Sequence, residues 1–212
     1  MPLIVGLGNP GKEYEGTPHN VGFETVARLT QRAGVLFRKS PVGNAEEAKL
    51  PRAGRVIAFR PLSYMNHSGL PVSAALRWYE FRPWEMLVVC DDVNLPLGFL
   101  RMRQSGGPGG QKGLISIIQQ LGTDEFPRLR IGVGGGHPGA DVAKHVLSRF
   151  SVRERQVVEA ALAYAADAVE CFLSEGLTTA MNRFNTRKEP VNPPPSGAPE
   201  ASDKSSPKGE QP

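Results

Sequence analysis

Short apolar runs alternate with amphipathic segments along the chain, and this alternation limits the choice of fold more than any other feature. The apolar runs have the length and composition of buried strands. Strands are predicted at residues 2–7, 55–60, 86–90, 99–103 and 129–133, and helices at 21–32, 68–81, 114–121 and between Ser151 and Gly176. Strands that alternate with helices predict an α/β fold with a largely parallel sheet covered on both faces.

The helix ends carry recognisable signals. Ser68 is expected to cap the second helix, and Ser151 with Glu154 forms the pattern of a capping box before the longest helix. Gly176 follows the last apolar position of that helix and is expected to end it.

The last 26 residues differ in composition from the rest of the chain. Residues 187–212 hold seven of the 19 prolines, contain no aromatic residue, and have four cations that cancel four anions. Such a segment cannot bury enough apolar surface to offset the entropy of ordering it. We therefore predict one folded domain at 1–186, which carries the whole net charge of +4, and a disordered tail at 187–212.

Composition excludes several classes of protein. Cys90 and Cys171 lie 81 residues apart without a second cysteine nearby, which argues against a disulfide scaffold or a cysteine-rich zinc site and favours a reducing compartment. No apolar run is long enough to cross a membrane, and residues 1–5 lack the basic start of a secretory signal. We expect a soluble, cytoplasmic protein.

Positive charge is concentrated between Arg28 and Arg60, where eight lysines or arginines face only Glu46 and Glu47. A solvated surface and a binding surface for an anionic partner are both open interpretations. A net charge of +4 is too small to identify a nucleic-acid-binding protein by itself.

Two glycine-rich segments resemble nucleotide-binding motifs without fulfilling them. The sequence GLGNPG at 6–11 matches the dinucleotide fingerprint, but Gly16 and Pro18 prevent the helix that should follow, and an arginine-rich stretch replaces the expected acid. The loop 105–113 lacks the Gly-Lys-Ser/Thr of a phosphate-binding loop. Its glycines either bring backbone N–H groups close to a ligand at a helix N-terminus or form a plain connector.

One histidine stands at a position suited to chemistry. His19 lies between the first strand and the first helix, Asn9 ends the first strand, and Asp91 and Asp92 end the strand at 86–90. In an open α/β sheet ligands collect at the carboxyl ends of strands, so these side chains meet if the two strands are neighbours. The set provides a base with an orienting partner but no serine or cysteine nucleophile.

Five segments together resemble the bacterial peptidyl-tRNA hydrolase family over nearly all of 1–186. They are IVGLGNPGKEY at 4–14, TPHNVGF at 17–23, PLSYMNHSG at 61–69, VVCDDVNLP at 88–96 and RLRIGVG at 128–134. The resemblance implies a single three-layer α/β/α domain around a mixed, largely parallel sheet, acting as a monomer without metal or cofactor. It implies hydrolysis of the ester between a peptide and the 3′ end of tRNA, with no obligate protein partner.

The resemblance also implies roles for individual residues. His19 would be the general base for water and Asp91 its hydrogen-bond partner, although Asp92 is an open alternative. Asn9 and Asn66 would hold the substrate by their amides. Aromatic stacking on the terminal base and phosphate binding would fall to four further residues, which are Tyr14, Tyr64, Arg103 and Arg130.

Three positions depart from the family pattern. Pro18 replaces the usual arginine before the histidine, Asn94 stands where an aspartate is frequent, and Gln111-Lys112 replaces His-Asn. A lysine donates hydrogen bonds but cannot accept them. Our hypothesis is that Lys112 contacts a tRNA phosphate or the developing oxyanion.

Two other functions remain open at this point. A non-hydrolytic RNA-binding relative on the same fold gains support from Lys112 and loses it to the intact set Asn9, His19, Asn66 and Asp91. A nucleotide-dependent oxidoreductase is disfavoured by Arg28 and Arg32 near the place where an acid should bind ribose.

Overall fold

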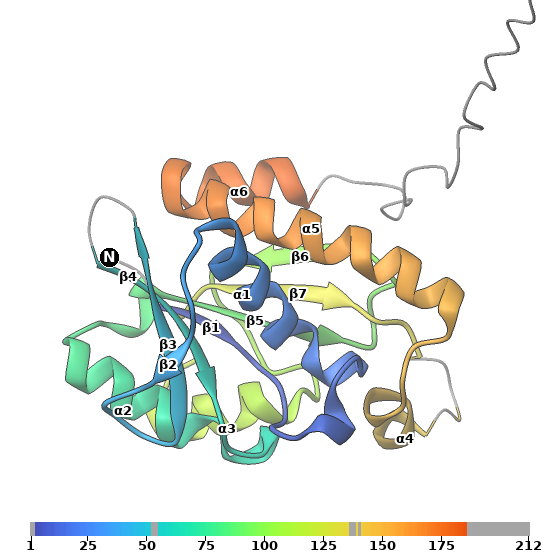
Figure 1. Ribbon diagram of the computed structural model, residues 1–212, viewed down its shortest axis with the longest axis horizontal. Helices are drawn as coiled ribbons and strands as arrows, with labels where there is room; N and C mark the ends of the chain where they lie inside the picture. The colour runs from blue at the N-terminus through green and yellow to red at the C-terminus, as the bar shows by residue number, and fades with distance from the viewer. Residues whose placement is uncertain (1–2, 52–54, 136–138, 140, 186–212) are drawn as a thin grey trace, which may run out of the picture.

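A computed structural model describes residues 3–51, 55–135, 139 and 141–185. The predicted tail at 187–212 lies outside the described residues. Within them the chain forms one seven-stranded sheet in the order β2-β3-β4-β1-β5-β7-β6 (Figure 1). The strands are β1 Leu3–Gly6, β2 Arg38–Lys39, β3 Ala45–Pro51, β4 Arg55–Pro61, β5 Met86–Asp92, β6 Leu100–Arg103 and β7 Arg128–Gly132.

The centre of the sheet is parallel and its edges are antiparallel. Strand β1 pairs in parallel with β4 and β5, and β5 pairs in parallel with β7. The edge strands β2 and β6 run antiparallel to their neighbours, and β3 runs antiparallel to both β2 and β4. The predicted mixed, largely parallel sheet is confirmed, and so is the adjacency of β1 and β5 on which the cleft hypothesis depended.

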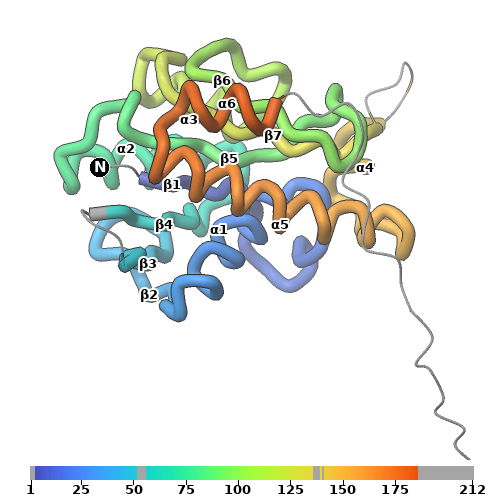
Figure 2. Tube along the Cα trace, turned by 90° about the horizontal axis from the view of Figure 1, so that it is seen from above, coloured from blue at the N-terminus to red at the C-terminus, as the bar shows by residue number. Residues whose placement is uncertain are grey.

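Helices cover both faces, as predicted. In Figure 1, α1, α5 and α6 lie on one side of the sheet and α2 and α3 on the other, and Figure 2 shows the first group lying over the strands. The helices are α1 Val21–Arg32, α2 Gly69–Tyr79, α3 Lys112–Leu121, α4 Val142–Leu147, α5 Val152–Glu175 and α6 Leu177–Phe184. Short 3-10 turns are η1 Lys12–Tyr14, η2 Pro18–Asn20, η3 Met65–His67 and η4 Pro83–Glu85.

The side-chain alternation of β1 shows how the two cores form. Leu3 and Val5 point into the core under α2 and α3, whereas Ile4 points into the core under α1 and α5. All three are fully buried. A strand buried on both faces must be apolar at every position, which explains the continuous run in the sequence.

The helix signals were right at α5 and partly wrong at α2. Ser151 and Glu154 form the predicted capping box, whose hydrogen bonds lower the pKa of Glu154, and Gly176 ends α5 with a φ of 87°. Ser68 precedes α2, but its hydroxyl donates to the Met65 carbonyl inside its own turn. The N–H of Gly69, at the start of α2, donates instead to Ser116 Oγ of α3, at 3.0 Å.

The sequence analysis missed β2, β3, α4 and α6. Strand β3 carries Glu46 and Glu47 within a charged stretch, so its pattern did not stand out as a strand. Strand β2 lies at the edge of the sheet and has only two residues, both exposed, which is too short to leave a strand pattern in the sequence.

Much of the basic stretch between Arg28 and Arg60 is neutralised within the fold. Arg28 pairs with Glu159 and Arg32 with Asp167, both on α5, and Arg60 pairs with Glu46. These ion pairs link α1 to α5 and β4 to β3. The remaining cations with described side chains, Arg38, Lys39 and Lys49, are exposed.

Gly22 allows α1 to lie close to the ends of β1 and β5. A Cβ at this position would lie 2.4 Å from the Val89 carbonyl oxygen and 2.5 Å from the Leu7 nitrogen. Both obstacles are backbone atoms of the sheet, so the helix itself would have to move. His19 lies in η2, which leads directly into α1, so the distance of the first turn of α1 from the sheet affects the position of that side chain.

We expect Gly22→Ala to lower the free energy of unfolding by about 2–3 kcal/mol, because overpacking against backbone cannot be relieved by a rotamer change. Gly107→Ala is the matched control, since a Cβ there meets nothing within 4 Å. Urea unfolding of both variants measures the difference. Equal stabilities would contradict the close approach of α1.

Candidate active site

The segment between β1 and α1 returns to the carboxyl end of the central strands. The Leu7 N–H donates to the Val89 carbonyl at 2.9 Å, and the Phe23 N–H donates to the Leu7 carbonyl at 3.1 Å. Between these anchors, η1 and η2 replace the single helix of a dinucleotide fold, as Gly16 and Pro18 predicted. Pro18 is the first residue of η2, where a fixed φ and a missing N–H are tolerated.

His19 and Asp91 form a buried pair at this edge of the sheet. His19 Nδ1 lies 2.8 Å from Asp91 Oδ2, and the two residues are 9% and 2% exposed. Asp91 is on β5 and His19 on η2, 72 residues apart. The adjacency of β1 and β5 thus brings together the base and the orienting carboxylate that the sequence suggested.

The neighbouring aspartate has a different partner. Asp92 Oδ2 lies 3.0 Å from Arg130 Nη1 on β7, and its Oδ1 accepts from the Asn94 N–H at 2.9 Å. Successive residues of a strand point to opposite faces, so Asp91 and Asp92 cannot both face His19. The choice between them, open in the sequence, is made by the pleat of β5.

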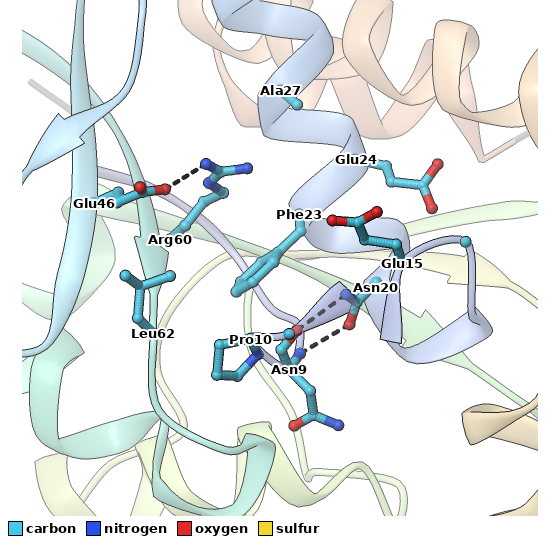
Figure 3. A pocket seen from close by; sticks show the side chains of 12 residues that line it. Asn9, Pro10, Glu15, Asn20, Phe23, Glu24, Ala27, Glu46, Arg60 and Leu62 are labelled. Atoms are coloured by element: carbon cyan, nitrogen blue, oxygen red, sulfur yellow. Dashed lines mark hydrogen bonds and ion pairs between the residues drawn. The ribbon is translucent and has the colours of Figure 1, made fainter. Parts of the chain in front are cut away.

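Asn9 is held on three sides. Its N–H donates to Asn20 Oδ1 at 2.8 Å and its carbonyl accepts from Asn20 Nδ2 at 3.0 Å, as Figure 3 shows. Its side-chain Oδ1 accepts from the Met65 N–H at 2.7 Å. Because a backbone N–H only donates, the Asn9 amide is fixed with its NH₂ as the free end. Asn20, to which the sequence analysis gave no role, is therefore part of the site.

Gln111 is a second residue of the site that sequence reasoning did not assign. Its Nε2 lies 3.0 Å from Asp91 Oδ1, and its Oε1 accepts from the Leu114 N–H at 2.8 Å as the N-cap of α3. The sequence showed only that Gln111 precedes a helix. Its contact with Asp91, 20 residues away, depends on how α3 packs below the sheet.

Most of the predicted binding residues line one cavity of about 620 Å³, but Arg103 and Arg130 do not. Among its lining residues are Asn9, Tyr14, His19, Tyr64, Asn66 and Lys112. Tyr14 and Tyr64 meet edge to face, with ring centroids 6.4 Å apart, and Tyr64 is 56% exposed. An exposed ring beside the cavity offers a flat apolar surface for stacking.

A smaller cavity of about 250 Å³ adjoins the other side of His19. Its lining includes Asp91, Gly109, Gln111 and Arg130. Val142 and Val146 of α4 line both cavities, so this short helix, absent from the sequence prediction, covers the space between them.

Arg103 and Lys112 are the predicted cations with exposed side chains. Lys112 is the first residue of α3 and lines the larger cavity, whereas Arg103 is at the end of β6 and is not among the lining residues of either cavity. The structure thus brings Lys112 to the site and leaves Arg103 at its periphery.

The glycine-rich loop is fastened by two arginines of β7. Arg128 is fully buried and donates to the Gly106, Asp124 and Phe126 carbonyls, and Arg130 donates to the Gly107 carbonyl at 2.6 Å. Burial lowers the pKa of Arg128. A phosphate-binding loop presents N–H groups to its ligand. Here two successive carbonyls face arginines, so the loop is a fixed wall of the site rather than a connector.

A third cavity of about 340 Å³ lies on the Phe23 side of Asn9. Its walls include Glu15, Glu24 and Arg60, while the Asn9 side chain points away from Phe23 (Figure 3). Neither His19 nor Asp91 lines it. The Asn9–Asn20 pair therefore separates this cavity from the one that contains His19.

Two kinds of feature are missing from the described residues. No group of three or more histidine, cysteine or acidic side chains there could hold a metal ion. No helix in the same part of the chain is long and apolar enough to cross a membrane.

The chain is similar to known proteins over most of its length. A family model described as peptidyl-tRNA hydrolase matches residues 3–192. Peptidyl-tRNA hydrolases of Chloroflexus aggregans and Chlorobaculum parvum are 48% and 47% identical, covering 87% of this chain and 99% and 98% of theirs. The crystal structure of peptidyl-tRNA hydrolase from Acinetobacter baumannii superposes with a TM-score of 0.82 at 33% identity, covering 88% of this chain and 95% of that one.

The α/β/α fold shared with the solved peptidyl-tRNA hydrolase, together with the curated relatives, places the chain in the hydrolase class of enzymes. The chain belongs to the peptidyl-tRNA hydrolase family. The GLGNPG segment is therefore part of a peptidyl-tRNA hydrolase fold and not the fingerprint of an oxidoreductase.

We expect Asn20→Asp to lower kcat/KM for peptidyl-tRNA by about tenfold, because an aspartate accepts from the Asn9 N–H but cannot donate to its carbonyl. Asn185→Asp is a matched control, since Asn185 binds the N–H and carbonyl of Met102 in the same way, at 2.7 and 2.9 Å. Both variants should lose similar stability in urea unfolding. Equal losses of activity would contradict a specific role for Asn20.

Proposed function

We propose that this protein hydrolyses the ester between a peptide, or an N-blocked aminoacyl group, and the 3′ end of tRNA, with His19 as the general base. The observation that carries the proposal is the buried His19–Asp91 pair at 2.8 Å, beside a cavity lined by two amides and two tyrosines. Its biological role would be to release tRNA from prematurely dropped peptidyl-tRNA. We further propose a cytoplasmic monomer.

In this mechanism, His19 Nε2 takes a proton from water as the water attacks the ester carbonyl. Asp91 accepts a hydrogen bond from Nδ1, which orients the ring and stabilises the imidazolium that forms. The imidazolium then returns the proton to the ribose oxygen as the ester bond breaks. A free serine or cysteine nucleophile is not needed in such a scheme, because the water is the nucleophile.

The fixed orientation of Asn9 supports a role in binding the acyl group. Its Oδ1 is already used by the Met65 N–H, so its NH₂ is the group available to a ligand. A donor at this place suits a peptide carbonyl oxygen, or the same oxygen as it acquires negative charge. The exposed Asn66 lines the same cavity and would bind a second polar group of the substrate.

The tRNA end would be bound by the residues around the mouth of the cavity. Tyr14 and Tyr64 would stack on the terminal base. Lys112 would bind a phosphate, with Arg103 as a more distant contact. Arg130 is already engaged by Asp92 and the Gly107 carbonyl, so binding a phosphate would require it to share its guanidinium.

The test of the reaction uses N-acetyl-aminoacyl-tRNA and free aminoacyl-tRNA as paired substrates. We expect rapid cleavage of the blocked ester only, and a loss of about 10²–10⁴-fold in kcat for His19→Ala, the range of general-base catalysis. The Kd of His19→Ala for tRNA serves as the control and should be unchanged. Tight tRNA binding without cleavage by the wild-type protein would instead favour the RNA-binding alternative.

The role of Lys112 predicts a change in salt dependence. For Lys112→Ala we expect weaker tRNA binding and a slope of log Kd against log salt that is smaller by about 0.7–0.9, the value for one lost phosphate contact. Lys49→Ala, an exposed lysine of β3, is the control and should leave the slope unchanged. An unaltered slope and unaltered turnover for Lys112→Ala would refute this role.

A further inference from the structure

Gln111 connects the backbone of α3 to the His19–Asp91 pair by hydrogen bonds. Which atom donates and which accepts is fixed at each of these bonds. We propose that Gln111 is a positioning residue that fixes His19 in the tautomer with its proton on Nδ1 and its lone pair on Nε2. The catalytic consequence rests on the proposed function, because Nε2 is the atom that must accept a proton from water. The tautomer itself does not depend on that function.

The donor and acceptor roles are set by a backbone group that can only donate. The Leu114 N–H can only donate, and it lies 2.8 Å from Gln111 Oε1. This contact decides which end of the amide is oxygen. The other end, Nε2, must then donate, and it lies 3.0 Å from Asp91 Oδ1.

The acceptor role of Asp91 then decides which ring nitrogen of His19 carries the proton. With Oδ1 accepting from Gln111, an ionised Asp91 also accepts on Oδ2, which lies 2.8 Å from His19 Nδ1. Nδ1 must then carry the proton in the neutral ring. The lone pair remains on Nε2, as a general base requires.

Burial keeps out water molecules that could otherwise exchange the donor and acceptor roles in these hydrogen bonds. Gln111, Asp91 and His19 are 8%, 2% and 9% exposed, so few water molecules can supply alternative donors. Both N–H donors of the Gln111 amide are also occupied, because Nε2 lies 3.2 Å from Met65 Sδ as well as near Asp91. Rotation of the amide would place two donors together at Leu114 and two acceptors together at Asp91.

Two substitutions separate this role from a merely structural one. Gln111→Glu keeps an oxygen for the Leu114 N–H, and so keeps the cap of α3, but it replaces the donor to Asp91 by an acceptor. Gln111→Met removes both bonds at similar side-chain length. Gln119→Glu is the matched control, because it makes the same chemical change at an exposed position of the same helix.

The decisive measurement is NMR of ¹⁵N-labelled histidine, with the His19 signals assigned by comparison with His19→Ala. We expect wild-type His19 and the Gln119→Glu control to show the Nδ1–H tautomer. In Gln111→Glu and Gln111→Met we expect a mixture of tautomers. For both Gln111 variants kcat should fall about tenfold or more, with a change in KM of less than about twofold.

The outcomes distinguish the two proposals. An Nε2–H tautomer in the wild-type protein would overturn the role of Gln111 without any variant, even if both variants fail to fold. A dominant Nδ1–H tautomer in folded Gln111→Met would overturn it as well. Absence of peptidyl-tRNA cleavage by the wild-type protein would refute the proposed function and leave the tautomer measurement valid.

Discussion

The parallel pairing of β1 with β5 at the centre of the sheet is the interaction on which the site depends. It places the ends of both strands at one edge, so that Asn9 and Asp91 lie close together although 82 positions separate them. Gly22 lets α1 lie against this edge, and His19, in the 3-10 turn that leads into α1, is thereby brought to Asp91. The central strands provide the rigid frame, and the turns between β1 and α1 supply the reactive groups.

Around that edge, polar groups are bound mostly by backbone atoms rather than by free charges. Asn9 is fixed by Asn20 and Met65, and Gln111 is fixed by the first turn of α3. Arg128 and Arg130 bind carbonyls of the glycine-rich loop. Backbone N–H and carbonyl groups have permanent polarity, so they orient the amides that touch them. Such preorganisation is how a site can select one protonation state without a large electrostatic field.

The ion pairs show that several of the cations behind the net charge of +4 have a structural role. Arg28, Arg32 and Arg60 stood out in the sequence as a basic stretch, yet they join α1 to α5 and β4 to β3. Lys112 at the mouth of the larger cavity is an exposed cation placed where a phosphate could be bound. Under the proposed function, in which mainly the end of tRNA is bound, a few placed cations are enough, and strong neutralisation of phosphates would slow release of the product.

The sequence by itself determined the α/β class, the central strands, the ends of α5 and the candidate set around His19, because burial on both faces and helix capping leave local patterns. Five matching segments also identified the family. Only the tertiary structure decided between Asp91 and Asp92, since that choice depends on the pleat of β5 and the register of β1. It likewise revealed β3, whose charged residues hide the strand pattern, and α4. The contacts of Asn20 and Gln111 also came only from the structure, because an amide shows its partner only after distant segments have packed together.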